Sequence, residues 1–129
     1  MIEKVLAEVD DFYALATVYW ADLSNALFKR NGGHELTSKE AHDLEVLEHQ
    51  LLEGFRTFGY SSSRLLLIGE KDVEKALRGM RDAVDDFFQI GNVDNPKCTD
   101  EALESHRALI QTARRGFFDA LGIAFRNDE

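Results

Sequence analysis

The stretch that decides the fold is Val5–Phe28, VLAEVDDFYALATVYWADLSNALF. Its apolar residues recur every three to four positions through three heptads, which is the period of an amphipathic helix with a wide core-facing stripe. This repeat predicts a helix over residues 3–30. Lys29 and Arg30 fall in its last turn, where cations suit the helix dipole, and Asn31–Gly33 is typical of a helix end. The stripe consists of Val5, Leu6, Val9, Phe12, Tyr13, Ala16, Tyr19, Trp20, Leu23, Ala26 and Leu27.

A second helix is predicted to begin at Thr37, because Thr37 and Glu40 have the spacing of a capping box. Gly59 is one candidate for its end. Alternatively the helix continues over residues 37–68, straight or kinked near residue 59, or residues 65–68 form a short strand. We favour the long helix, because its length matches that of the first helix in an antiparallel hairpin, whereas the strand would lack a partner. Its apolar face consists of Ala41, Leu44, Leu47, Leu51, Phe55 and Phe58.

Two further helices are predicted over residues 71–90 and 99–126. A loop containing Asn-Pro separates them, and Thr99 is the expected N-cap of the last helix. The third stripe consists of Val73, Ala76, Leu77, Met80, Ala83, Val84, Phe87 and Ile90. The fourth stripe consists of Leu103, His106, Ile110, Ala113, Phe117, Ala120 and Ala124.

Four amphipathic helices joined by short connections predict an all-α, antiparallel up-down-up-down four-helix bundle. At 129 residues the chain fits a single domain, residues 1–129, with one shared core. One domain of a longer protein is the alternative for its organisation. The bundle predicts that the centre of each apolar stripe is buried. One such residue from each helix is Val9, Leu51, Met80 and Ile110 respectively.

Composition narrows the range of partners and compartments. The formal net charge of -9 repels phosphates, so neither nucleic acid nor an anionic membrane surface is an expected partner. A single cysteine cannot form an internal disulfide, and no apolar stretch is long enough to span a bilayer. We therefore expect a cytoplasmic protein without a membrane span. No nucleotide-binding or other cofactor motif is present, and no cofactor is expected.

Two segments carry a family resemblance. Residues 63–77, SRLLLIGEKDVEKAL, and residues 113–122, ARRGFFDALG, resemble the helical cytosolic region of small uncharacterised bacterial proteins. In those proteins a helix ends in an apolar run and a glycine before the next amphipathic helix. The resemblance implies that the second helix reaches Gly69, and it implies no activity. Many such relatives carry a membrane helix first, which this chain lacks.

Pairs of carboxylates three residues apart raise one catalytic alternative. Helical nucleotide pyrophosphatases hold Mg²⁺ with such pairs, because a hard cation needs several oxygens that converge from neighbouring helices. The alternative function is therefore a magnesium-dependent, nucleotide-hydrolysing enzyme. It requires that pairs from different helices meet in one pocket. The pairs are Glu45 and Glu48, Asp82 and Asp85, and Glu101 and Glu104.

The histidines and the cysteine suggest weaker sites. His42, Glu45 and His49 fall on one polar face of the second helix, where a solvated face is expected rather than a metal site. His106 lies in the apolar stripe of the fourth helix, where a structural role is expected. Cys98 precedes a helix N-terminus, which can activate a thiol, but no base or orienting group lies nearby in the sequence.

An excess of aromatic residues gives the leading functional hypothesis. In adjacent aromatic pairs one side chain can enter the core while the other lies at its edge, since neighbours on a helix point about 100° apart. Edge aromatics are typical of surfaces that bind a partner or a second copy. We therefore predict a non-catalytic protein that acts through protein–protein interaction or self-association, including a homodimer, such as a regulator, an inhibitor or an immunity factor. The predicted partner-binding residues are Phe28, Phe88, Phe118, Leu121 and Phe125.

Overall fold

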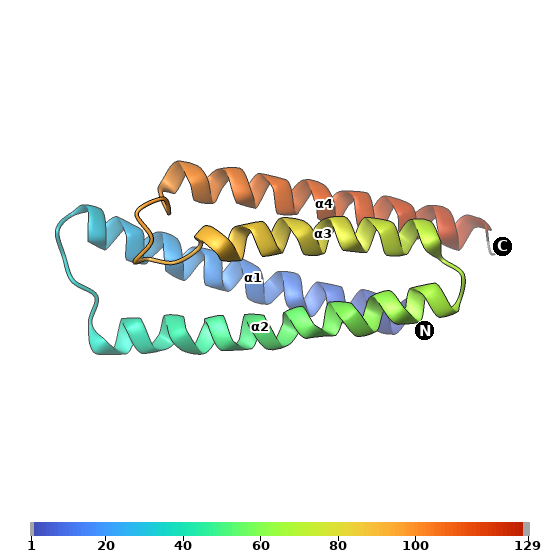
Figure 1. The fold of residues 1–129 in the computed structure, drawn as a ribbon, viewed down its shortest axis with the longest axis horizontal. Coiled ribbons are helices and arrows are strands. Elements are labelled where there is room, and N and C mark those ends of the chain that lie inside the picture. The colour runs from blue at the N-terminus through green and yellow to red at the C-terminus, as the bar shows by residue number, and fades with distance from the viewer. Residues whose placement is uncertain (1, 128–129) are drawn as a thin grey trace.

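The computed structural model describes residues 2–127, and these form four helices and their connections (Figure 1). The helices are α1 (Ile2–Asn31), α2 (Ser38–Leu67), α3 (Lys71–Ile90) and α4 (Asp100–Asn127). They alternate in direction, which confirms the predicted all-α, up-down-up-down bundle. Helix α2 is uninterrupted at Gly59, so the long helix was the right choice and residues 65–68 do not form a strand.

The bundle is built from two antiparallel hairpins. Helix α1 packs closely on α2, and α3 packs closely on α4. The hairpins meet mainly through α2 and α3, whereas α1 and α4 approach each other least. The seam between α1 and α4 is therefore the most loosely packed of the four.

Local hydrogen bonds set most of the helix ends. Thr37 and Glu40 form the predicted capping box, and the Thr99 hydroxyl accepts from the Ala102 amide at 3.1 Å. Helices α1 and α2 both end in a Schellman motif whose glycine, Gly33 or Gly69, has a positive φ. These motifs satisfy carbonyls that the helix leaves open and turn the chain back on itself.

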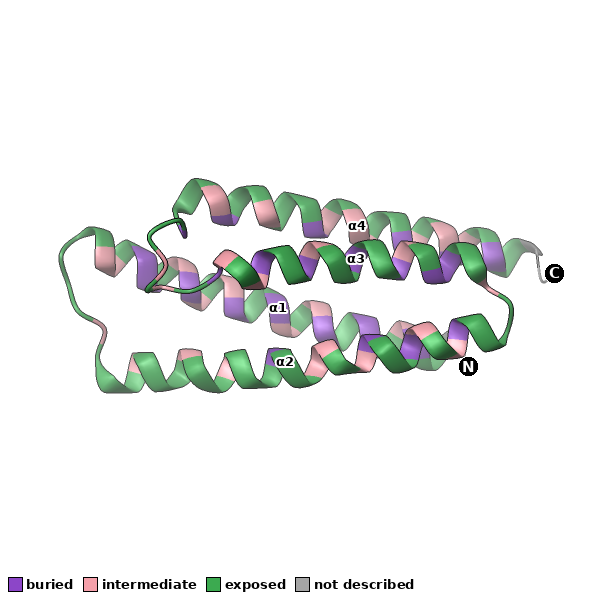
Figure 2. Ribbon diagram, viewed as in Figure 1, coloured by how far each residue is buried: buried purple, intermediate pink, exposed green. Residues whose placement is uncertain are grey.

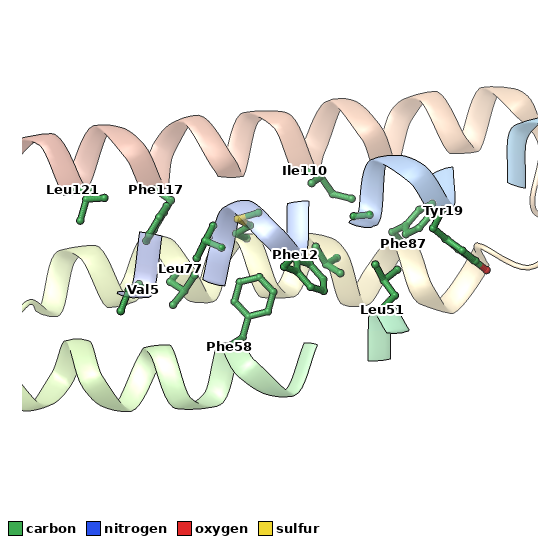
Figure 3. Close-up of a cluster of buried hydrophobic side chains, with 14 of the residues drawn as sticks. Val5, Phe12, Tyr19, Leu51, Phe58, Leu77, Phe87, Ile110, Phe117 and Leu121 are labelled. Carbon is green, nitrogen blue, oxygen red and sulfur yellow. The ribbon is translucent and has the colours of Figure 1, made fainter. Parts of the chain in front are cut away.

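A continuous apolar core runs along the bundle axis (Figure 3). The predicted centre of each apolar stripe is buried, namely Val9, Leu51, Met80 and Ile110. Aromatic rings meet edge to face, as between Phe12 and Phe58, whose centroids are 4.6 Å apart. The largest fully buried side chains are Phe58, Phe87, Phe117, Leu23, Leu27, Leu51, Leu65, Leu77, Met80 and Leu103.

The first half of α2 departs from the predicted core. No residue of α2 before Leu51 is buried, and this half is coloured almost entirely as exposed or intermediate in Figure 2. Ala41 is exposed, while Leu44 and Leu47 are only partly buried. The prediction that all three line the shared core was therefore wrong for Ala41 and only partly right for Leu44 and Leu47.

Helix length explains this departure. Helix α2 has 30 residues, whereas α3, which returns alongside it, has only 20. At 1.5 Å per residue, the C-terminal end of α3 therefore lies roughly 15 Å short of the N-terminal end of α2. Helix α1 also diverges from α2 toward the loop that joins them (Figure 1). We call residues 38–50 of α2 the overhang, because α3 does not extend along them and their apolar residues Leu44 and Leu47 are only partly buried.

The loop after α3 covers the end of α1 instead. The Arg30 guanidinium donates to the carbonyls of Val93 and Cys98, at 2.6 and 2.9 Å. The Tyr19 hydroxyl donates to the Gly91 carbonyl at 2.8 Å. These bonds hold residues 91–98 over the last turns of α1, where Leu27 is fully buried.

Two glycines of α2 give a matched test of the α1–α2 contact. A Cβ on Gly54 would lie 2.8 Å from the Phe12 ring, whereas a Cβ on Gly59 would meet nothing within 4 Å. Replacing a helical glycine by alanine gains roughly 0.5–1 kcal/mol, and overpacking a core costs about 1–3 kcal/mol. We therefore expect Gly59→Ala to raise the free energy of unfolding and Gly54→Ala to lower it, as measured by urea denaturation. Equal stabilisation by both substitutions would contradict the close α1–α2 contact.

Candidate functional site

Two hollows, of about 190 and 170 Å³, lie between α1 and α2. Their lining residues recur at helical spacing along both helices, so the two hollows lie on one seam. We call this seam the α1–α2 groove. The hollow beside the overhang is lined by Asp22, Asn25, Ala26, Leu36, Glu40, Asp43 and Leu44. The other is lined by Glu8, Asp11, Phe12, Leu15, Gly54 and Thr57.

Ion pairs join the two helices at both ends of the groove. Near the start of α1, the Glu8 carboxylate accepts from Arg64 and from Ser61, each at 2.5 Å. Near the end of α1, Lys29 pairs with Glu40. Twenty-one positions separate Glu8 from Lys29 on α1, which corresponds to roughly 30 Å of helix. The groove is therefore tied at both ends, and its two hollows lie along the span between these ties.

The carboxylates of both ties hold their charge to low pH. Burial raises the pKa of Glu8, but hydrogen bonds from Ser61 and Arg64 and the Arg64 charge outweigh it, and the pKa falls below its ordinary 4.5. Hydrogen bonds, first from Lys29 and then from Thr37, lower the pKa of Glu40 to about 2. Both groups therefore favour the folded state above about pH 4.5, and this contribution is lost as pH falls through the lowered values.

Between the ties the groove carries acidic groups over an apolar floor. Asp11, Asp22 and Asp43 form no ion pair with any side chain that the structure describes, and Asp11 and Asp43 are exposed. Ala26 is 4% exposed, and Leu44 is partly buried below these carboxylates. Leu15 lines the other hollow, Leu47 lies on the same helical row of α2 between the two hollows, and both are partly buried. The groove thus combines negative charge with apolar surface.

The five predicted partner-binding residues do not come together. Phe28 is 79% and Phe125 45% exposed, but they lie near opposite ends of the bundle. Phe88 and Phe118 are partly buried against the core, and Phe118 also stacks beneath a guanidinium. Leu121 is only 3% exposed and packs within the core (Figure 3). A partner surface built from all five is therefore not the one that the folded chain presents.

The carboxylate pairs of the magnesium hypothesis also remain apart. Glu45, Glu48, Asp82 and Asp85 are all exposed. Measured from the α2–α3 turn, the pair on α2 lies roughly 10 Å farther along the axis than the pair on α3. Within residues 2–127 no group of three or more His, Cys, Asp or Glu side chains is placed to hold a metal ion. The convergence that this hypothesis requires is not found in the described part of the chain.

The histidines are placed as the helix pattern predicts. Glu45 and His49 are largely exposed and 3.9 Å apart, and His42 is exposed beside them. His106 is partly buried, with its ring 6.3 Å from that of Phe87. Its Nδ1 atom is buried without a hydrogen-bond partner among the described residues.

Cys98 is a core residue. Its side chain is fully buried, and burial raises the pKa of the thiol despite the nearby Arg30 charge. At neutral pH the thiol is therefore protonated, the form that is a poor nucleophile.

Comparison with known proteins adds no family to this description. No protein-family model, curated protein or solved structure matches the chain. Among the described helices, none is both long and apolar enough to cross a membrane.

The groove-end tie at Glu8 gives a test with a clear pH dependence. We expect Glu8→Gln to lower the free energy of unfolding by about 1–2 kcal/mol at pH 7, since it removes charged hydrogen bonds that are mostly shielded from solvent. The difference from wild type should narrow below pH 4.5, as Glu8 becomes protonated. Urea denaturation followed by circular dichroism at several pH values measures both effects.

Glu53→Gln is the matched control, because the Glu53–Arg56 pair is exposed at both side chains. We expect this substitution to change stability by less than about 0.5 kcal/mol at any pH. A loss for Glu8→Gln that stays constant from pH 7 to pH 3 would show that its charge does not tie the helices.

Proposed function

We propose that the protein is a docking module that binds a basic amphipathic helix of another protein in the α1–α2 groove. The observation that carries this proposal is the overhang, an amphipathic half-helix in which no residue is fully buried and whose Leu44 and Leu47 are only partly covered. A helix that lies in an apolar groove is a common mode of peptide recognition. A groove of roughly 30 Å would accommodate about 20 residues of helix.

Charge selects the partner. The overhang carries Glu40, Asp43, Glu45 and Glu48 against a single basic residue, Lys39. Asp22 adds another carboxylate from the α1 side of the hollow. A partner with lysine or arginine along the edges of its apolar stripe would neutralise these groups, whereas an acidic partner would be repelled.

The same charges disfavour a second copy as the occupant. In a two-fold dimer the same surface patch meets itself, so the groove of one copy would lie against that of the other. Each carboxylate row would then face an identical row, on chains that each carry a net charge of -9. Self-association through this groove is thus the less favoured form of the interaction hypothesis.

A designed peptide tests the proposal directly. The probe is a fluorescent 20-residue helix of leucine and lysine with an apolar stripe, and its counterpart has glutamate in place of lysine. At physiological salt we expect fluorescence anisotropy to show saturable binding of the lysine peptide and none of the glutamate peptide. Asp22→Asn with Asp43→Asn should weaken binding by about tenfold, since each carboxylate contributes somewhat less than 1 kcal/mol.

The control separates docking in the groove from general attraction to an acidic protein. Asp82→Asn with Asp85→Asn removes the same two charges from an exposed face of α3. We expect this variant to bind the lysine peptide within twofold of wild type. Equal weakening by the two double variants would overturn the proposal, and so would a dimer in light scattering that the Asp22/Asp43 variant strengthens.

A further inference from the structure

A second recess lies on the other side of α1, in the loosely packed seam with α4. It has a volume of about 50 Å³ and a mixed lining in which aromatic and aliphatic side chains are the majority. Tyr13, Ala16 and Trp20 contribute from α1, Phe87 from α3 and Ile110 from α4. Thr17 of α1 and Gln111 of α4 add polar groups, and Arg107 of α4 is the charged residue of the lining. We call this recess the α1–α4 slot.

One wall of the slot is fixed in place. The Trp20 indole donates from Nε1 to the Leu103 carbonyl at 3.2 Å, which ties the ring to α4. Phe87 is 2% exposed and packs edge to face with Tyr19 at 6.1 Å. The aromatic surface of the slot is therefore held rigidly by the core behind it.

The charged group at the slot is held loosely. The Arg107 guanidinium lies over the Trp20 ring, 4.7 Å from its centroid. Its carboxylate partner, Glu104, is 3.5 Å away, and both side chains are substantially exposed, at 45% and 64%. Exposed pairs of this kind contribute little free energy, so Arg107 can exchange this partner for another anion at small cost.

A second arginine, Arg114, repeats the arrangement two turns farther along α4. Arg114 stacks on Tyr13 at 4.4 Å and on Phe118 at 4.6 Å, and its pair with Asp10 is 3.4 Å long. Its Nε atom is buried without a hydrogen-bond partner among the described residues. This seam thus presents guanidinium groups on aromatic rings, in contrast to the acidic α1–α2 groove.

We propose that the α1–α4 slot binds small monocarboxylates that carry a planar aromatic ring. The ring takes the place of the guanidinium against Trp20, and the carboxylate pairs with the displaced Arg107. Because the guanidinium is itself part of the lining, its outward movement enlarges the slot to accept the ring. The net charge of -9 disfavours ligands with several negative charges, since the repulsion grows with ligand charge.

Trp20 provides the measurement, because it is the only tryptophan in the chain. The probe is benzoate, and benzamide is the neutral compound of the same shape. We expect benzoate to cause a saturable change in tryptophan fluorescence in the millimolar range, together with a shift of the Ile110 methyl resonance in NMR spectra. Benzamide should bind at least about tenfold more weakly, since it cannot form the ion pair.

Variants identify the anion-binding group. Arg107→Gln should weaken benzoate binding at least about tenfold, whereas Arg56→Gln, which removes the same charge from an exposed position on α2, should leave it within twofold. Arg107→Lys keeps the charge but not the planar guanidinium, so its affinity for benzoate should lie between those of the Arg107→Gln and Arg56→Gln variants. The Ile110 shift reads binding in each variant even where the substitution alters Trp20 fluorescence.

Three results would overturn the proposal. They are the absence of saturation by benzoate, equal binding of benzoate and benzamide, and equal binding of benzoate by the Arg107→Gln and Arg56→Gln variants. None of them affects the α1–α2 groove, which lies on the opposite side of α1 and is tested with a ligand of opposite charge.

Discussion

The difference in length between α2 and α3 governs the surface of this molecule. Four helices of equal length would bury one stripe each and leave no face open. Because α3 is ten residues shorter than α2, the core has four helical walls only along part of its length. The chain closes the end of α1 with the loop after α3, fixed by Arg30, but the first half of α2 is covered only in part and has no fully buried residue. A half-covered amphipathic segment is the direct result.

The two seams beside α1 differ in a way that follows from their packing. Along α2, the absence of a side chain at Gly54 lets the helices approach closely at Phe12, and toward the loop that joins them they spread apart around the hollow lined by Asp22, Glu40 and Asp43. Along α4, the approach is looser, and arginine side chains fill the space over aromatic rings. One helix therefore separates surfaces of opposite character, because residues on its two flanks face different neighbours.

Much of the fold could be predicted from the sequence, because helix period and capping are local properties. The stripes, the capping box at Thr37 and the continuation of α2 through Gly59 are all determined by residues close in sequence. The exposure of Ala41 could not be predicted in this way. The residue falls on the apolar face of the helix, and it is exposed only because no neighbouring element packs against it. Whether a neighbour exists depends on where α3 stops and on how α1 diverges, which are tertiary facts.

The candidate sites were less predictable than the fold. No pattern in the sequence singles out Asp22 and Asp43, because they come together only where the two helices face each other across a hollow. The aromatic pairs did indicate edge positions, and Phe28 and Phe125 are indeed exposed, but their separation along the bundle is invisible in a linear pattern. Leu121 is the opposite case, since it was predicted to lie on the partner-binding surface and is buried. A secondary stripe on a helix can belong to the core when the helix has two neighbours.

The last turn of α1 has a mechanical consequence. Lys29 and Arg30 are adjacent, so their side chains leave the helix in different directions, one toward α2 and the other toward the loop between α3 and α4. A single helical turn is thus the junction of both hairpins at this end of the molecule. Fraying of that turn would release both hairpins at once, so local opening here should be cooperative. Slow amide exchange should then extend across both hairpins at this end rather than be confined to one of them.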